Sequence, residues 1–180
     1  MKLKEKQLST KKMYECFFMK LYEDEVLLPN GEKSTRIYIK HDGASAVLPI
    51  TINNTVLLIK QFRYPIGVVS LEIPAGKKDE PGEDGLLCAK RELEEETGHQ
   101  SNNIKKIMDL HNCVGYSDEK IEMFIAYDCD RVENPLDMDE DEFIELVECT
   151  INDVKQYLKN GEITDAKTIV ALQHYLLEVE

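Results

Sequence analysis

The alternation of apolar and polar residues divides the chain into short strands followed by helical segments. Residues 44–51 and 55–62 are apolar runs joined by Asn53-Asn54, which predicts a hairpin. Residues 34–41 alternate in the manner of a strand and follow the turn sequence Pro29-Asn30-Gly31, so an earlier hairpin is expected before residue 43. Further strands are predicted at 102–113, 120–127 and 143–149.

Three segments have helical spacing. After turn sequences at 74–76 and 81–82, Leu86, Ala89 and Leu93 recur at intervals of three and four, which predicts a helix with one buried stripe, and Gly98 suits its C-terminal cap. Helices are also predicted at 151–159, after Thr150 as N-cap and before Asn160-Gly161, and at 166–179, after Asp165. Strands mixed with helices in one chain predict an α/β fold.

Glu92, Glu95 and Glu96 gather on another side of the first helix, because residues advance by about 100° each. Carboxylates so close repel one another, and a hard divalent cation such as Mg²⁺ would make the arrangement favourable. The alternative is a solvated acidic helix face.

Composition narrows the possible partners. The 180 residues are 42% hydrophobic and carry a net charge of −13, which indicates a single domain and argues against nucleic acid or an anionic membrane as partner. No apolar run reaches 18 residues, and the basic start lacks the apolar segment of a secretion signal. Five cysteines without a CxxC pair favour reduced thiols in a cytoplasmic protein.

Other charged residues stand beside the predicted strands. Arg63 follows a buried strand and could bind phosphate bidentately, or it is an ordinary surface arginine. Glu72 lies in a short apolar strand and could bind a metal through water or hold a substrate hydroxyl, or it is an exposed edge residue. Glu119 ends a Gly- and Ser-containing loop that we expect to be flexible; it is a candidate general base or late metal ligand, or simply a surface carboxylate. Residues 131–141 are expected to form a solvated acidic loop.

The stretch from Gly76 resembles the Nudix box, the metal-binding signature of hydrolases that act on nucleoside-diphosphate-linked compounds. The matching positions are Gly76, Glu83 and Arg91-Glu92-Leu93-x-Glu95-Glu96-x-Gly98, with seven residues between Glu83 and Arg91 as the family pattern requires. Within that family the chain is most similar to ADP-ribose pyrophosphatases. The stretches that carry this similarity are 36–44, Gln61-Phe-Arg-Tyr-Pro65, Leu71-Glu-Ile-Pro-Ala-Gly76, Gly115-Tyr-Ser-Asp-Glu119 and Gly161-Glu-Ile-Thr-Asp-Ala-Lys167.

The resemblance implies an α/β/α sandwich around a mixed sheet over residues 43–180, preceded by N-terminal strands in residues 1–42. Family members commonly form dimers by exchanging such strands, so a homodimer is expected. The implied metal ligands for Mg²⁺, with Mn²⁺ as substitute, are Glu92, Glu95, Glu96 and the Ala75 carbonyl. The implied substrate contacts are Arg36, Arg63 and Glu72, while Glu119, Glu95 and Arg91 form the implied catalytic set. Arg91 is expected to brace the loop through Glu83 or to orient Glu95, four residues on.

The expected reaction is hydrolysis of ADP-ribose to AMP and ribose 5-phosphate. Another nucleotide sugar such as GDP-mannose is the alternative substrate, since Val114 stands where ADP-ribose enzymes of the family usually have proline. A third possibility is a sensor that binds ADP-ribose without cleaving it. The complete set of glutamates and the lack of a basic patch argue against that possibility.

Overall fold

The computed structural model describes residues 2–78, 82–138 and 142–179, and the chain divides into two compact units. One unit comprises residues 1–43 and 111–120, and the other comprises residues 44–110 and 121–180. The predicted turn at 81–82 and the acidic loop at 131–141 lie partly outside the described residues.

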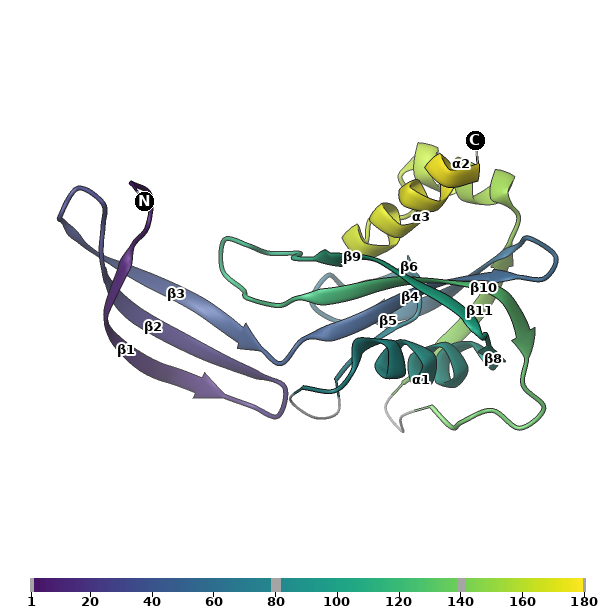
Figure 1. Cartoon of the computed structure of the whole chain (residues 1–180), viewed down its shortest axis with the longest axis horizontal. Coiled ribbons are helices and arrows are strands. Elements are labelled where there is room, and N and C mark those ends of the chain that lie inside the picture. The colour runs from purple at the N-terminus through teal and green to yellow at the C-terminus, as the bar shows by residue number, and fades with distance from the viewer. Residues whose placement is uncertain (1, 79–81, 139–141, 180) are drawn as a thin grey trace. The chain divides into compact units, whose positions relative to one another are not determined.

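The first unit is a three-stranded antiparallel sheet in the order β1-β2-β3, drawn in purple in Figure 1. Its strands are β1 (Lys6–Glu15), β2 (Met19–Leu27) and β3 (Lys33–His41). The expected hairpin joins β2 to β3, where the Leu28 N–H donates to the Glu32 carbonyl and Gly31 has a φ of +88°. Strand β1 adds to this hairpin, and every one of its residues is exposed in the single chain.

The second unit is built on a mixed sheet whose main path runs β11-β5-β4-β10-β8. Strands β4 and β10 are parallel, and the other pairs are antiparallel. Strand β6 pairs with β5, β7 with β4, and β9 with β10. The strands are β4 (Ala44–Thr51), β5 (Val56–Arg63), β6 (Val68–Glu72), β7 (Ala75–Lys77), β8 (His99–Gln100), β9 (Asn103–Leu110), β10 (Ile121–Arg131) and β11 (Ile144–Cys149).

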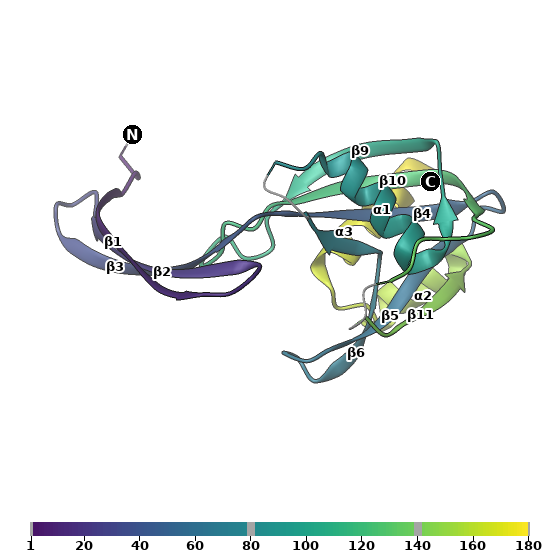
Figure 2. The ribbon, with the colours of Figure 1, turned by 90° about the horizontal axis from the view of Figure 1, so that it is seen from below.

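Helices cover both faces of this sheet: α1 (Gly85–Thr97) on one face, and α2 (Ile151–Asn160) and α3 (Ala166–Val179) on the other (Figures 1 and 2). Every residue of strand β4 is buried, because helices cover the sheet on both sides of it. Ala46, Leu48 and Ile50 join the core under α2 and α3, while Val47 points to the opposite face, into the core formed with α1. The α/β/α sandwich expected from the sequence is confirmed.

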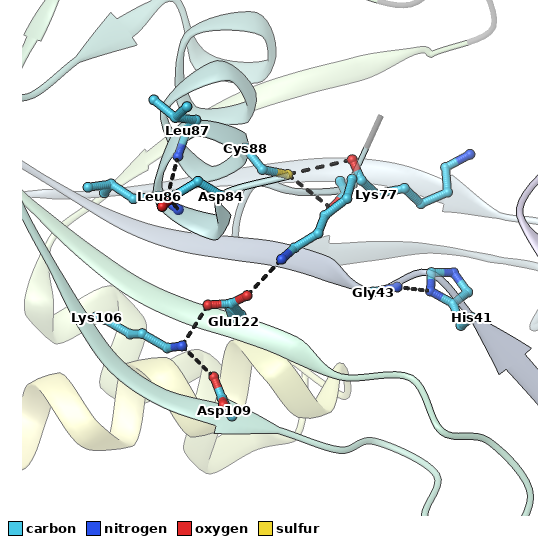
Figure 3. A network of polar contacts seen from close by, with 12 residues as sticks. His41, Gly43, Lys77, Asp84, Leu86, Leu87, Cys88, Lys106, Asp109 and Glu122 are labelled. Carbon is cyan, nitrogen blue, oxygen red and sulfur yellow. Dashed lines mark hydrogen bonds and ion pairs between the residues drawn. The ribbon is translucent and has the colours of Figure 1, made fainter. Parts of the chain in front are cut away.

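The helix ends follow the predicted caps. Gly98 closes α1 in the left-handed conformation with a φ of +66°. Thr150 and Asp153 form a reciprocal capping box at the start of α2, and Asp165 accepts a hydrogen bond from the Thr168 N–H at the start of α3. The N-cap of α1 is Asp84, whose carboxylate accepts from the Leu86 and Leu87 N–H groups (Figure 3). In the described part of the chain, no helix is long and apolar enough to cross a membrane.

Candidate active site

The buried face of α1 includes acidic residues as well as the predicted apolar ones. Ala89 and Leu93 are fully buried, and Glu92 and Glu96 beside them are only 5% and 4% exposed. Glu95, on the edge of this face, is partly exposed. Two carboxylates four residues apart are therefore withdrawn from water on the same side of one helix, an arrangement that is costly unless charge or hydrogen bonds compensate it.

The corner where β7 begins packs directly against these two carboxylates. The Ala75 N–H donates to Glu96 Oε2 at 2.9 Å. A Cβ added at Gly76 would lie 1.8 Å from Glu92 Oε1, so the Glu92 carboxylate occupies the space that only glycine leaves open. This contact gives the first glycine of the predicted motif a physical reason.

Burial dominates the titration of both groups. It raises the pKa of Glu92 to about 7, against the opposing effect of Arg91 and with the help of Glu95. Burial also raises the pKa of Glu96 to about 8, and the charge of Glu92 adds to the effect. The negative charge of Glu142 raises the pKa of both residues as well, so an acid to which the sequence analysis gives no role acts on this site.

Arg91 supplies the positive charge at this site. Its Nη1 lies 2.7 Å from Glu92 Oε1 and 2.9 Å from Glu95 Oε2, and its Nη2 donates to the Lys77 carbonyl at 3.1 Å. The contact with Glu95 is the one anticipated from the four-residue spacing. The brace between Arg91 and Glu83 stays a prediction.

The donor set fits a hard divalent cation. Among the described residues, no three His, Cys, Asp or Glu side chains lie together as a preformed metal cluster. Two buried carboxylates with raised pKa values nevertheless provide the oxygen ligands that Mg²⁺ prefers. Glu92, Glu96 and the Ala75 carbonyl are the groups that would hold the ion, with Glu95 reached by exchange of its Arg91 partner.

Arg63 and Glu72, expected separately as substrate contacts, are bound to each other. Arg63 Nε and Nη2 each donate to one oxygen of the Glu72 carboxylate at 2.8 Å, in a bidentate pair. Glu72 is 2% exposed, and burial acts to raise its pKa, but the hydrogen bonds and charges of Arg63 and Lys167 outweigh burial and lower the pKa to about 2. Both residues line an open pocket of about 390 Å³.

The start of α3 completes this pocket, and the sequence interpretation assigned it no role. Lys167 binds Glu72 Oε2, and Thr168 Oγ1 accepts from the Ile73 N–H at 2.9 Å while it donates to Asp165 at 2.6 Å. The stretch 161–167 contributes to the family resemblance, which does not say what Lys167 binds. Partners 95 residues apart cannot be read from local spacing, although a lysine at the start of a largely apolar helix was a usable signal.

A second ionic network, which the sequence analysis does not anticipate, lies beside the start of α1. Glu122 on β10 accepts hydrogen bonds from Lys78 at 2.7 Å and Lys106 at 2.6 Å, and these bonds lower its pKa to about 2 (Figure 3). A Cβ at Gly85 would lie 2.7 Å from the carboxyl carbon of Glu122, so this network packs against the first residue of α1. Glu122 therefore helps to fix where the helix begins.

Glu119 and Arg36 belong to the first unit. Glu119 Oε1 lies 3.8 Å from His41 Nε2. The Gly43 N–H donates to His41 Nδ1 (Figure 3), so a neutral ring would carry its proton on Nε2. Arg36 is exposed and pairs with Glu5.

The loop before Glu119, expected to be flexible, is hydrogen-bonded to β3 within the first unit. The Ile39 N–H donates to the Tyr116 carbonyl at 2.7 Å, and the His41 N–H donates to Asp118 Oδ1 at 2.9 Å. Asp118 therefore has a structural partner, whereas the carboxylate of Glu119 is directed at an imidazole.

Comparison with known proteins agrees with this geometry. Residues 40–172 match the model of the NUDIX domain, and the chain belongs to the NUDIX family. The expectation of a Nudix hydrolase is confirmed.

Several individual proteins are similar to this chain over most of its length. The chain is 39% identical to an ADP-ribose pyrophosphatase of Bacillus subtilis, over 98% of this chain and 95% of the relative. It is also 39% identical to a methanol dehydrogenase activator of Bacillus methanolicus, over 97% and 94%. A GDP-mannose pyrophosphatase of Pectobacterium atrosepticum is 31% identical, over 89% and 88%. A crystal structure described as an ADP compounds hydrolase has the same fold, with a TM-score of 0.82 at 21% identity, over 97% of this chain and 95% of the other.

The contact between Gly76 and Glu92 predicts that Gly76→Ala weakens binding of a divalent cation by about tenfold, as for loss of a group that orients a ligand. The added methyl group would displace the Glu92 carboxylate. Titration calorimetry with Mn²⁺ and with Mg²⁺ measures the effect. Gly115→Ala is the matched control, because its new Cβ meets nothing within 4 Å. Binding as tight as in the parent protein would contradict the assignment of Glu92.

The lowered pKa of Glu72 predicts how stability depends on pH. A carboxyl with a pKa near 4.5 when unfolded and about 2 when folded stabilises the protein fully above pH 4.5, and this contribution is lost as the pH falls toward 2. Glu72→Gln should therefore reduce the free energy of unfolding by about 3 kcal/mol at pH 7, since it also leaves Lys167 buried beside a neutral group.

Denaturant titrations of both proteins from pH 7 down to pH 2 measure this difference, which should shrink below pH 4.5. Glu145→Gln, at an exposed carboxylate on β11, is the control and should change stability by less than about 1 kcal/mol. A difference between parent and Glu72→Gln that stays constant down to pH 2 would contradict the lowered pKa.

Proposed function

We propose that this protein hydrolyses the diphosphate bond of ADP-ribose, releasing AMP and ribose 5-phosphate. The observation that carries the proposal is the pair of buried carboxylates, Glu92 and Glu96, held against the Ala75–Gly76 corner. Both residues have raised pKa values. The chain that carries them belongs to the NUDIX family. The 39% identity to an ADP-ribose pyrophosphatase over nearly the whole chain supports the choice of substrate.

Each residue has a role that its surroundings support. Glu92 and Glu96, with the Ala75 carbonyl and Glu95, would hold Mg²⁺ or, in its place, Mn²⁺. When bound, such an ion neutralises phosphate oxygens and lowers the pKa of a coordinated water. Arg91 holds Glu95 in position, and Arg63 presents the N–H groups not used by Glu72 to a phosphate. Arg36 is proposed as a further substrate contact.

Glu119 is the proposed general base. The chemistry requires a carboxylate that takes a proton from the attacking water, and the partner of Glu119 in the first unit, His41, is an imidazole that can share such a proton. Glu142 is the rival, because its charge acts on both Glu92 and Glu96.

The first unit supports a homodimer. It is a three-stranded sheet in which Val26 and Asp24 are the buried residues of the described strands, so it has almost no core of its own. Leu8, Met13, Tyr14 and Ile37 expose between 41% and 58% of their surface. An isolated sheet of this size with apolar residues in water is unstable without cover, and a second copy, contributing residues 1–42, is the proposed cover. Five free cysteines are consistent with a cytoplasmic protein.

GDP-mannose is the alternative substrate, supported by the 31% identity to a GDP-mannose pyrophosphatase. The two readings share the diphosphate chemistry and differ in base and sugar. Val114, at the tip of the loop that precedes Glu119, is 82% exposed and is the position where the sequence departs from ADP-ribose enzymes.

Loss of one helix carboxylate tests the metal-dependent reaction. Glu96→Gln keeps the shape but removes an anionic ligand, so kcat should fall by at least about 10²-fold in Mg²⁺. Glu94→Gln is the matched control on the same helix, since Glu94 receives its hydrogen bond from the Leu136 backbone. Released monophosphate from ADP-ribose and from GDP-mannose is the measurement. An unchanged rate would refute the site, whereas a higher kcat/KM for GDP-mannose would refute the choice of substrate alone.

The choice of base is tested by three single variants. Glu119→Gln should lower kcat strongly and leave KM within about threefold, because a lost base affects the transition state and not binding. Asp118→Asn should do less, because an asparagine oxygen can still accept from the His41 N–H. If Glu142→Gln lowers kcat and Glu119→Gln does not, Glu142 is the base.

The homodimer is tested by light scattering coupled to size exclusion. The full chain should have twice its 20.7 kDa mass, and the double variant Tyr14→Glu/Ile37→Glu should shift it toward the monomer. Lys11→Glu changes the charge of β1 without removing apolar surface and serves as control. A monomeric parent chain would contradict the proposal. Point variants are preferred to removal of the N-terminal strands, because β3 is hydrogen-bonded to the loop at 116–118 and its removal would also disturb that loop.

A further inference from the structure

Lys167 is a charged residue buried beside the pocket that Arg63 lines. It is 6% exposed, lies in the first turn of α3, and contacts two carboxylates: Glu72 Oε2, and Asp165 Oδ2 at 3.1 Å. A buried lysine is costly, and an apolar side chain of similar length often gives a protein of equal or greater stability. Its presence therefore calls for a reason other than packing.

Anchoring α3 to the sheet is already achieved by the residues next to Lys167. Thr168 is fully buried, accepts from the Ile73 N–H and donates to Asp165, which in turn caps the helix. The Lys167 amine adds a contact to a different group, the Glu72 side chain.

The Glu72 carboxylate links the lysine to the arginine. Its Oε1 accepts from Arg63 Nε, and its Oε2 accepts from both Arg63 Nη2 and Lys167 Nζ. A carboxylate held from both sides has one orientation, and that orientation fixes the plane of the Arg63 guanidinium. Within the described residues, these bonds leave the Nη1 group of Arg63 for a ligand, and the Arg63 side chain is 38% exposed at the pocket.

The charges of the residues that line the pocket also favour a role for Lys167 in phosphate binding. The pocket holds two cations, Arg63 and Lys167, and two anions, Glu72 and Asp165. Without Lys167 the net charge of these pocket residues would be negative. The carboxylate of Glu72 would then have Arg63 as its one cationic partner among them. Both changes oppose the approach of a phosphate group.

We propose that Lys167 is a positioning residue for substrate: it acts through Glu72 to hold Arg63 in the orientation that binds a phosphate. This inference rests on the phosphate contact of Arg63 in the proposed function and adds the residue that controls it. Lys167 itself does not touch the substrate.

The test uses Lys167→Met, Lys167→Arg and Glu72→Gln, with Lys159→Met as a matched control on the exposed side of α2. The first readout is the Arg63 Nε–H signal in an ¹⁵N–¹H NMR spectrum, assigned by its loss in Arg63→Lys. The signal should shift and exchange faster with water in Lys167→Met, remain in Lys167→Arg, and be unchanged in Lys159→Met. This readout does not depend on enzymatic activity, so it stands even if the proposed substrate is wrong.

The second readout is affinity for inorganic pyrophosphate by titration calorimetry, together with kcat and KM for ADP-ribose. Lys167→Met should weaken pyrophosphate binding about tenfold and lower kcat/KM by roughly 10²-fold, as expected for a misplaced binding group, with Lys167→Arg restoring most of the loss. If the parent binds pyrophosphate but hydrolyses no nucleotide sugar, the proposed function fails while the positioning role is still measured.

The double variant Glu72→Gln/Lys167→Met decides between positioning and direct contact, and it also covers the case in which Lys167→Met alone does not fold. If Lys167 acts through Glu72, the double variant matches Glu72→Gln in both readouts. An additional loss of the same size as in the parent background would show that Lys167 acts directly and would overturn the proposal. An Arg63 signal unchanged in Lys167→Met would overturn it as well.

Discussion

The structure depends on one costly contact, the burial of Glu92 and Glu96 against the corner at Ala75–Gly76. A fold that only needed stability would place apolar side chains there, because these positions face the same side of α1 as Ala89 and Leu93. Two buried acids whose pKa values are raised toward neutrality instead fit the cation site proposed above. Function explains what packing alone does not.

The corner keeps its shape because it is held from both faces of the sheet. From one side, α1 reaches it through Glu96 and the Ala75 N–H. From the other side, α3 reaches it through Thr168 and the Ile73 N–H, and through Lys167 and Glu72. A segment of five residues is thus fixed by two helices that do not share a core cluster. Such support is what a catalytic site needs to keep its groups in place.

Local sequence patterns were sufficient to predict the helices and the hairpin that joins β4 to β5. The spacing of Leu86, Ala89 and Leu93, and the glycine at 98, predicted α1 because both signals act within a few residues. Strand β1 has no buried face in the single chain, so its sequence shows no alternation of apolar and polar residues to detect. The helix caps could be predicted because each depends on neighbouring residues, whereas a strand that is exposed along its whole length could not be located from its pattern.

The candidate site was predicted as a set of residues and not as a set of contacts. Sequence spacing places Glu92, Glu95 and Glu96 on one side of the helix, but it cannot show which of them the β7 corner will cover. It assigned Arg63 and Glu72 separate roles, although they form one bidentate pair. The pairing of Glu72 with Lys167 depends on the sandwich bringing α3 beside β6, which no local pattern contains.

These pairings explain how a chain with a net charge of −13 can receive a polyphosphate. Arg63, Lys167, Lys78 and Lys106 are each bound to a carboxylate, so the site does not rely on a large surplus of positive charge. Attraction would then come from N–H groups of fixed direction and from a cation held by the proposed ligands, both of which act at short range. Long-range steering is weak in such an arrangement, and selectivity depends on whether a substrate places its phosphates where those few groups already point.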